Sequence, residues 1–295
     1  MAAGSKRLIA VAFVLVVVCW ATRPAAMQQR TTSAVRIVSL VPALTEMLFA
    51  IGAGPQVIAI SSYDEFPPEV TSLPRVGALL DPDMERILAL RPDLVVSYGS
   101  QTDVQAQLAR AKIRVFSYKH AGLAGVFTTL KDLGAAVGRP AESDNLARQI
   151  RTGLDAIQAR VRGRPQPRTL LVFERDPASL RGVYVSGGVG FLHDMLGIAG
   201  GVNVFADVAR ESVQPSIETM LARAPEVILE VRATGLLAAT DIAQARRVWG
   251  ALGAMPAVKQ GRIEILTGEH LVVPGPRVVQ ATAAFARALH PDVYK

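Results

Sequence analysis

The sequence contains a single cysteine, Cys19, which lies inside an apolar run near the N-terminus. One cysteine cannot form an intramolecular disulfide, so the fold of this 295-residue chain must rest on its hydrophobic core. Half of the residues are hydrophobic and only 19% are charged, which allows a sizeable core and argues against general disorder. The length suits one large domain or two of ordinary size.

Dense blocks of positive charge interleaved with aromatic residues are also missing from the sequence. The net charge is +7, but Lys6, Arg7 and Arg23 lie in the first 26 residues, which contain no acid. The rest of the chain therefore carries +4, which is +7 minus these three charges. A charge of this size serves solubility, and we expect no nucleic-acid partner.

The sequence lacks the signatures of nucleotide hydrolysis and of serine hydrolases. The stretch "SGGVG" (186–190) could bind a phosphate through its backbone amides, but no P-loop lysine follows, and glycine at a tight turn explains it more simply. Ser186, His193 and Asp194 are residue types of a catalytic triad, but they are crowded onto one turn and helix without a nucleophile elbow. We therefore expect neither nucleotide hydrolysis nor serine-hydrolase chemistry.

The N-terminus has the layout of a secretory signal. Two cations precede an apolar run of 14 residues, from Leu8 to Ala21, and small residues follow it. The run is shorter than the roughly 20 residues that span a bilayer. We predict a signal peptide over residues 1–26 and a periplasmic protein, with a retained membrane anchor as the alternative. Val18 is not the small residue that a lipoprotein signal has before its cysteine, which disfavours lipidation.

Apolar strand-like runs alternate with helical patterns along the rest of the chain. Strands are predicted at 35–42, 57–63, 92–99, 113–118, 169–174, 182–188 and 262–268. Such alternation favours a parallel sheet with helices on its faces. Between the two halves, apolar residues at 146, 150, 154, 157 and 161 predict one long amphipathic helix.

The sequence therefore predicts an α/β protein with two Rossmann-like lobes joined by one long rigid helix. The lobes are expected at 35–139 and 166–295, and the linking helix at 140–163. Ligands bind such sheets at the carboxyl ends of their strands, so we expect a ligand cleft between the lobes.

One unit occurs twice, as "PDMERILALRPDLVV" (82–96) and "PSIETMLARAPEVIL" (215–229). In each copy an N-cap residue, Asp83 or Ser216, precedes a short helix that a proline ends. Leu88 and Leu221 are expected to face inward. A second echo, "EMLFAIGAG" (46–54) against "DMLGIAGGV" (194–202), also indicates duplication of the lobe.

Each copy keeps a glutamate, Glu85 or Glu218, in the first turn of its helix. The helix must run antiparallel to the strand that follows, so its N-terminus lies at the rim of the cleft. An acid there complements the helix dipole, which is a sufficient structural reason for it. One carboxylate per lobe on the open face could also be recognised by two arginine clusters of a partner.

The stretches "SLVPALTE", "SSYDEFPP" and "MERILALRPDLV" resemble the substrate-binding proteins of bacterial ABC importers for cobalamin, haem and ferric siderophores. The resemblance extends from Val35 to the C-terminus. It implies a non-enzymatic monomer without a cofactor that binds a corrinoid and delivers it to an ABC permease dimer, on which Glu85 and Glu218 dock. Haem or a ferric siderophore is the alternative cargo.

The resemblance also implies a set of ligand contacts. The tyrosine of "SSY" is Tyr63, the matching aromatic residue of the second lobe is Tyr184, and the loop 267–271 corresponds to a ligand-contacting segment. Two tryptophans of the family's corrinoid cleft are replaced by Leu79 and Ser212. The expected ligand-binding residues are Pro42, Tyr63, Leu79, Tyr184, Gly268, Glu269 and His270.

A metal-dependent enzyme on a similar fold is a further alternative. His120 follows a strand, and His270 lies beside Glu269 in the expected ligand loop, so these residues could meet in the cleft or cap a cobalt or iron centre. Arg277, after "PGP", is expected at a helix start near the cleft or on the surface.

Overall fold

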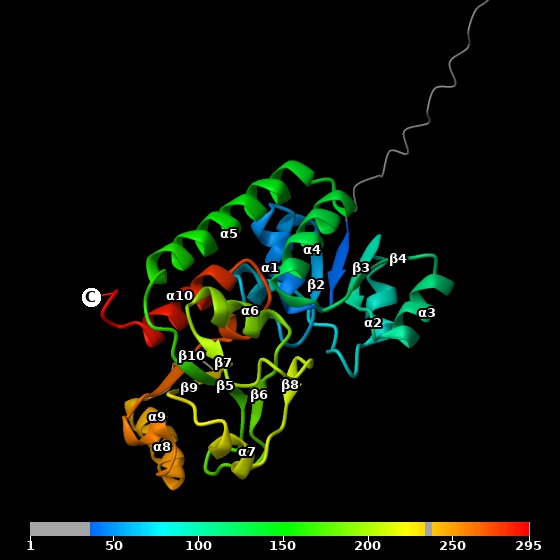
Figure 1. Cartoon of the computed structure of the whole chain (residues 1–295). Helices are drawn as coiled ribbons and strands as arrows, with labels where there is room; N and C mark the ends of the chain where they lie inside the picture. Colours follow the sequence, from blue (N-terminus) through cyan, green and yellow to red (C-terminus); the bar gives the residue numbers. More distant parts are fainter. Residues whose placement is uncertain (1–35, 234–237, 295) are drawn as a thin grey trace, which may run out of the picture. The chain divides into compact units, whose positions relative to one another are not determined.

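The computed structural model describes residues 36–233 and 238–294 (Figure 1). The predicted signal peptide, residues 1–26, lies outside this part of the chain. None of the helices in the described part combines the length and hydropathy required to cross a membrane.

The first sheet is formed by four parallel strands in the order β2-β1-β3-β4. They are β1 (Ile37–Ser39), β2 (Val57–Ile60), β3 (Leu94–Tyr98) and β4 (Arg114–Tyr118). The helices of this part are α1 (Pro42–Ala50), α2 (Met84–Ala89), α3 (Thr102–Arg110) and α4 (Gly122–Ala136). All four strands were predicted, because each is a short apolar run that turn residues bound. We call this part, residues 36–139, the first lobe.

The second sheet has the order β10-β9-β5-β6-β8, with β7 paired to β5. Its strands are β5 (Arg168–Glu174), β6 (Tyr184–Ser186), β7 (Val202–Asn203), β8 (Ser212–Val213), β9 (Val227–Arg232) and β10 (Ile263–Thr267). The expectation of a wholly parallel sheet is wrong here, since β6 is antiparallel to both β5 and β8. A loop without a helix joins β5 to β6, and a parallel pair requires a longer crossover. We call residues 166–294 the second lobe.

The linking helix is α5 (Pro140–Val161), close to its predicted bounds. Its residues Ile150, Leu154, Ile157 and Val161 are buried, as the apolar spacing predicted. The second lobe contributes α6 (Phe191–Ile198), α7 (Ile217–Ala222), α8 (Ala239–Trp249), α9 (Pro256–Lys259) and α10 (Val278–Leu289). Short 3₁₀ helices occur at Gly54–Gln56, Pro68–Ser72, Gly250–Leu252 and Glu269–Leu271.

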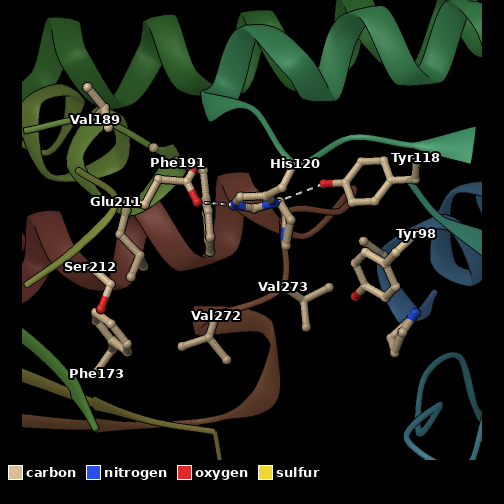
Figure 2. A pocket seen from close by; sticks show the side chains of 15 residues that line it. Tyr98, Tyr118, His120, Phe173, Val189, Phe191, Glu211, Ser212, Val272 and Val273 are labelled. Atoms are coloured by element: carbon tan, nitrogen blue, oxygen red, sulfur yellow. Dashed lines mark hydrogen bonds and ion pairs between the residues drawn. The ribbon is translucent and has the colours of Figure 1, made fainter. Parts of the chain in front are cut away.

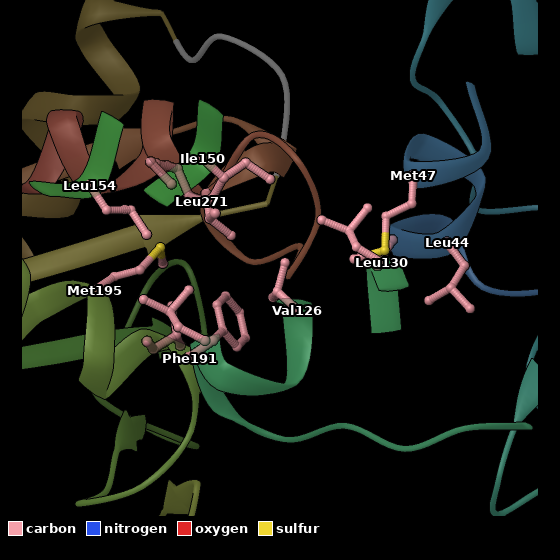
Figure 3. Packing of buried hydrophobic residues seen from close by; sticks show 14 of the residues in the cluster. Leu44, Met47, Val126, Leu130, Ile150, Leu154, Phe191, Met195 and Leu271 are labelled. Atoms are coloured by element: carbon pink, nitrogen blue, oxygen red, sulfur yellow. The ribbon is translucent and has the colours of Figure 1, made fainter. Parts of the chain in front are cut away.

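A single hydrophobic cluster runs through both lobes and the linking helix (Figure 3). It includes Leu130 of α4, Ile150 of α5, Met195 of α6 and Leu271 of the second lobe. Two smaller clusters lie one in each lobe, around residues 38–108 and 170–265. A core that both lobes share opposes large relative movement, because opening it would expose apolar surface.

The repeated unit forms the same structure twice. Asp83 accepts a hydrogen bond from the Arg86 amide at 2.9 Å, and Ser216 accepts one from the Thr219 amide at 3.2 Å, which confirms both N-caps. Each helix ends before a residue with a left-handed backbone, Arg91 or Ala224, at φ of 48° and 45°. These shared irregularities support duplication of the unit.

The expected orientation of Leu88 is wrong. The side chain is 37% exposed, whereas Ile87 is fully buried. Met84, Ile87 and Leu90 contact the core at a spacing of three residues, which turns Leu88 outward. In the second copy Met220 is buried and Leu221 is partly buried against the core.

Candidate functional site

A cavity of about 390 Å³ lies between the two lobes (Figure 2). From the first lobe it is lined by the start of α1, by Tyr98 and Tyr118 at the ends of β3 and β4, and by His120. From the second lobe it is lined by Phe173 of β5 and by the segments 189–192, 211–212 and 272–274. The position at the carboxyl ends of parallel strands agrees with the expected cleft. We call this space the central cavity.

One wall of the central cavity is a row of aromatic rings in edge-to-face contact. The ring centroids lie 5.7 Å apart for Tyr98 and Tyr118, 6.2 Å for Tyr118 and His120, and 5.4 Å for His120 and Phe191. Across the cavity, Phe173 lies against Tyr184 with centroids 6.3 Å apart. Interlocked rings give a stiff apolar surface on which a flat ligand can pack.

A polar chain crosses the same cavity. The Tyr118 hydroxyl lies 3.0 Å from His120 Nδ1, and His120 Nε2 lies 3.7 Å from the Glu211 carboxylate. Burial raises the pKa of Tyr118 well above its ordinary value, so its hydroxyl keeps its proton and can either donate to Nδ1 or accept from it. Where the hydroxyl donates, His120 Nε2 carries the proton that faces Glu211.

A second chamber of about 250 Å³ shares Pro42, Val272 and Val273 with the central cavity. Within it the Arg277 guanidinium bonds both Glu46 oxygens, at 2.6 and 3.0 Å, and lies 4.0 Å from the Phe66 ring centroid. Arg277 is the N-cap of α10 and is largely buried, so the alternative of a surface arginine is wrong. Burial raises the pKa of Glu46, and the bonds to Arg277 oppose that shift.

Two carboxyl groups from opposite lobes, Glu65 and Glu269, also line the second chamber. A side-chain hydrogen bond with Glu65, then burial, raises the pKa of Glu269 to about 6. Two carboxyl groups this close share a proton more readily than they carry two negative charges. The neighbouring His270 has a lowered pKa because of burial and the charge of Arg277.

A third chamber of about 470 Å³ lies at the ends of β5 and β9 and shares Phe173 with the central cavity. Glu230 is buried there between two arginines, 3.0 Å from Arg175 Nε and 2.7 Å from Arg232 Nε. Trp249 Nε1 donates to the same carboxylate at 2.7 Å. The three spaces have lining residues in common, so they lie next to one another.

The expected ligand contacts fall into two groups. Pro42 lines the central cavity and the second chamber, and Tyr63 and Glu269 line the second chamber. Leu79, Tyr184, Gly268 and His270 line none of the three spaces. The Tyr184 ring contacts that of Phe173, while Leu79 is 38% exposed. Ser212, at one of the replaced tryptophans, lines the central cavity.

Sequence reasoning missed several lining residues. Tyr98 and Tyr118 are the last residues of β3 and β4 and lie at or next to the ends of the predicted strands, so the carboxyl-end rule could have identified them. Glu211 precedes a two-residue strand and had no pattern to mark it.

The residues of the proposed metal site do not come together in one cavity. His120 lines the central cavity and Glu269 the second chamber. Within residues 36–233 and 238–294, no three His, Cys, Asp or Glu side chains are placed to hold a metal ion. The three triad residue types likewise have separate partners, and Asp194 accepts a hydrogen bond from the Leu123 amide at 2.8 Å.

Glu85 and Glu218 are both exposed in the first turns of α2 and α7. A hydrogen bond with Ser216 lowers the pKa of Glu218, so this group is ionised at neutral pH. Over the part of the chain that the structure describes, neither carboxylate takes part in a salt bridge. Both are therefore free to contact another molecule.

Comparison with known proteins adds independent information. The family model described as periplasmic binding protein matches residues 37–269. The vitamin B12-binding protein of Salmonella typhimurium is 30% identical over 259 residues, which cover 87% of this chain and 91% of that protein. An uncharacterised ABC transporter substrate-binding lipoprotein of Bacillus subtilis, YvrC, is 27% identical over 268 residues, 88% of this chain and 81% of that protein.

Solved structures give the same fold. The periplasmic vitamin B12-binding protein BtuF of Vibrio cholerae superposes with a TM-score of 0.73 at 25% identity and covers 89% of this chain and 98% of that one. A periplasmic haem-binding protein of Pseudomonas aeruginosa gives a TM-score of 0.74 at 25% identity, with 88% and 93% covered. Proteins named for different cargoes thus share this architecture.

Proposed function

Because the chain belongs to the periplasmic binding protein family and is a substrate-binding protein of an ABC importer, we propose that its cargo is a corrinoid such as cobalamin. The protein would bind this cargo between its lobes in the periplasm and deliver it to the permease. We propose that it acts as a monomer and has no catalytic activity. The relatives named for vitamin B12 support this choice of cargo.

The observation that carries the proposal is the aromatic central cavity with its two side chambers. A corrinoid is a large ring with apolar faces and an edge of amide groups. The edge-to-face row from Tyr98 to Phe191 supplies an apolar wall for one face. The adjacent spaces of about 390, 250 and 470 Å³ supply room that one small pocket would not.

The ligand contacts that we propose lie on both lobes. Tyr63 is 70% exposed at the second chamber, and a large ring left this exposed is a natural contact for a bound molecule. Pro42 and Glu269 line the same chamber. We propose Leu79, Tyr184, Gly268 and His270 as contacts at the edges of the cleft.

A binding titration tests the cargo. Isothermal calorimetry with cyanocobalamin, haemin and a ferric hydroxamate siderophore is expected to give one tight partner, the corrinoid. Tyr63→Ala is expected to weaken that binding about tenfold, through loss of one aromatic face. Leu80→Ala, which removes a more exposed apolar side chain that lines none of the three spaces, serves as the control. Tight binding of haemin or the siderophore instead would assign the cargo to that class.

We further propose that Glu85 and Glu218 dock the protein on the permease dimer. The support is their equivalent position in the two copies of the repeated unit and their exposure without a salt bridge. The double variant Glu85→Ala/Glu218→Ala should reduce corrinoid transport in proteoliposomes with the cognate permease while leaving corrinoid affinity unchanged. Glu69→Ala/Asp144→Ala removes two exposed acids elsewhere and should transport normally. Equal transport by both double variants would contradict the docking role.

A further inference from the structure

The central cavity carries one carboxylate, and its position suggests how the cleft discriminates between cargoes. We propose that Glu211 is a specificity-determining residue that selects macrocycles with neutral amide edges over macrocycles with carboxylate edges. This inference rests on the proposed function, because it concerns the corrinoid that the same cleft would hold.

The first support is the charge of the cavity wall. Among the residues that line the central cavity there is no lysine or arginine, and Glu211 is the single acid. Its side chain is 49% exposed and faces His120 of the opposite lobe at 3.7 Å. Its backbone carbonyl accepts a hydrogen bond from the Gly187 amide at 3.1 Å, so the residue is held at this point of the wall.

The second support is that the arginines lining the two side chambers are already paired. In the second chamber Arg277 is bonded to both Glu46 oxygens, while Glu65 and Glu269 add further negative charge. In the third chamber Arg175 and Arg232 both bond Glu230. Across the described walls of the cleft, each arginine is thus already bonded to a glutamate.

The chemistry of the two cargo classes then separates them. An ionised carboxylate is a hydrogen-bond acceptor only, and a primary amide offers two donors that can satisfy it. A propionate on a haem edge offers another acceptor and a second negative charge, and like charges a few ångströms apart repel in a partly desolvated cleft. Glu211 therefore favours an amide edge and opposes a carboxylate edge.

A matched pair of ligands isolates this effect. Cyanocobalamin and a monocarboxylate derivative, in which one amide of the ring edge is hydrolysed, differ by a single charge. We expect the wild-type protein to bind cyanocobalamin at least tenfold more tightly than the derivative. Glu211→Gln should reduce this ratio, and Glu211→Lys should bring it to unity or reverse it. Haemin binding should strengthen in the same order of variants.

The control is Glu69→Lys, which makes the same change in net charge on an exposed residue outside the three spaces and should leave the ratio unchanged. Thermal melts of Glu211→Gln and Glu211→Lys check that both variants fold. If the wild type binds corrinoid and the ratio is the same in Glu211→Lys and Glu69→Lys, the inference is wrong while the proposed function stands. If the wild type binds no corrinoid at micromolar concentration, both are wrong.

Discussion

Breaking the ion pair between Glu46 and Arg277 should be among the most destabilising single changes in this protein. Arg277 begins α10 in the second lobe, and Glu46 lies on α1 in the first, 231 residues earlier. The side chains are only 14% and 3% exposed. Arg277→Met would leave the Glu46 carboxylate buried without a partner, and would also remove the guanidinium from the Phe66 ring.

The magnitude follows from burial. Loss of one partner of a buried ion pair costs about 3–5 kcal/mol, since the remaining charge keeps its desolvation penalty. For a domain of this size that corresponds to a fall in Tm of roughly 10 °C. Burial already raises the pKa of Glu46, and loss of Arg277 should raise it further. A group whose pKa is raised by folding loses stability as the pH rises through that pKa, so the defect should be largest at neutral pH and smaller in acid.

The assay is urea unfolding followed by circular dichroism at pH 7.5 and pH 5. Arg164→Met is the matched control: its guanidinium pairs with Asp292 at 3.2 Å, but the two side chains are 50% and 61% exposed. That variant should lose less than about 1 kcal/mol. Glu46→Met/Arg277→Met replaces both charges and should recover part of the lost stability. If Arg277→Met and Arg164→Met are equally stable, the argument from burial is refuted.

Three further predictions concern stability. Glu269→Gln should flatten the pH dependence of Tm between pH 4.5 and 6, because the raised pKa of Glu269 makes the folded wild type less stable as the pH rises through about 6. Melts at pH 4.5 and 7.5 should therefore differ less in the variant than in the wild type. The corresponding difference in the free energy of unfolding is up to about 1 kcal/mol for this partly exposed group. Glu230→Gln should lose about 3–5 kcal/mol of stability in urea unfolding, because Arg175 and Arg232 lose their shared carboxylate. The control is Glu264→Gln, which removes the carboxylate of a more exposed pair with Arg246 and should lose under about 1 kcal/mol. Gly188→Ala should lose about 3 kcal/mol or more of the free energy of unfolding, because its Cβ would lie 2.0 Å from the Ala206 carbonyl oxygen. Gly163→Ala, at φ of 76° with open space around it, should lose about 1 kcal/mol. Equal melting temperatures of the two variants would contradict the packing argument.

Local chemistry explains which parts of the fold could be predicted from sequence. The caps Asp83 and Ser216 act within three residues, and the parallel strands are apolar runs with clear ends, so both have signals in short windows. The predicted strand at 182–188 contains β6, but its antiparallel direction was not predicted, and β8 has only two residues, too few for a periodic pattern. Their antiparallel direction depends on the conformation of the connecting loops, which no sequence pattern in a short window predicts.

In the candidate site, too, some residues could be predicted from local sequence and others only from the packed fold. The rule that ligands bind at the carboxyl ends of parallel strands placed the cleft correctly and would also have pointed to Tyr98 and Tyr118. The partners of Glu46 and Glu211 come from the opposite lobe, so only the packed fold brings them together. The orientation of Leu88 depends on which face of the six-residue helix α2 meets the core, and a helix this short has no full apolar repeat that would mark this face.

The contacts between the lobes bear on how the cleft can choose its cargo. One hydrophobic cluster runs through both lobes, Arg277 clamps Glu46 across them, and Asp194 of α6 caps the start of α4 by accepting from the Leu123 amide. Each of these contacts would have to break for a wide opening, so closure around a ligand must be small. A binder that cannot reshape its cleft must discriminate with walls that are already in place. Charge at a fixed point of the wall, as at Glu211, is then a more effective selector than any closing motion, since it acts before the lobes move.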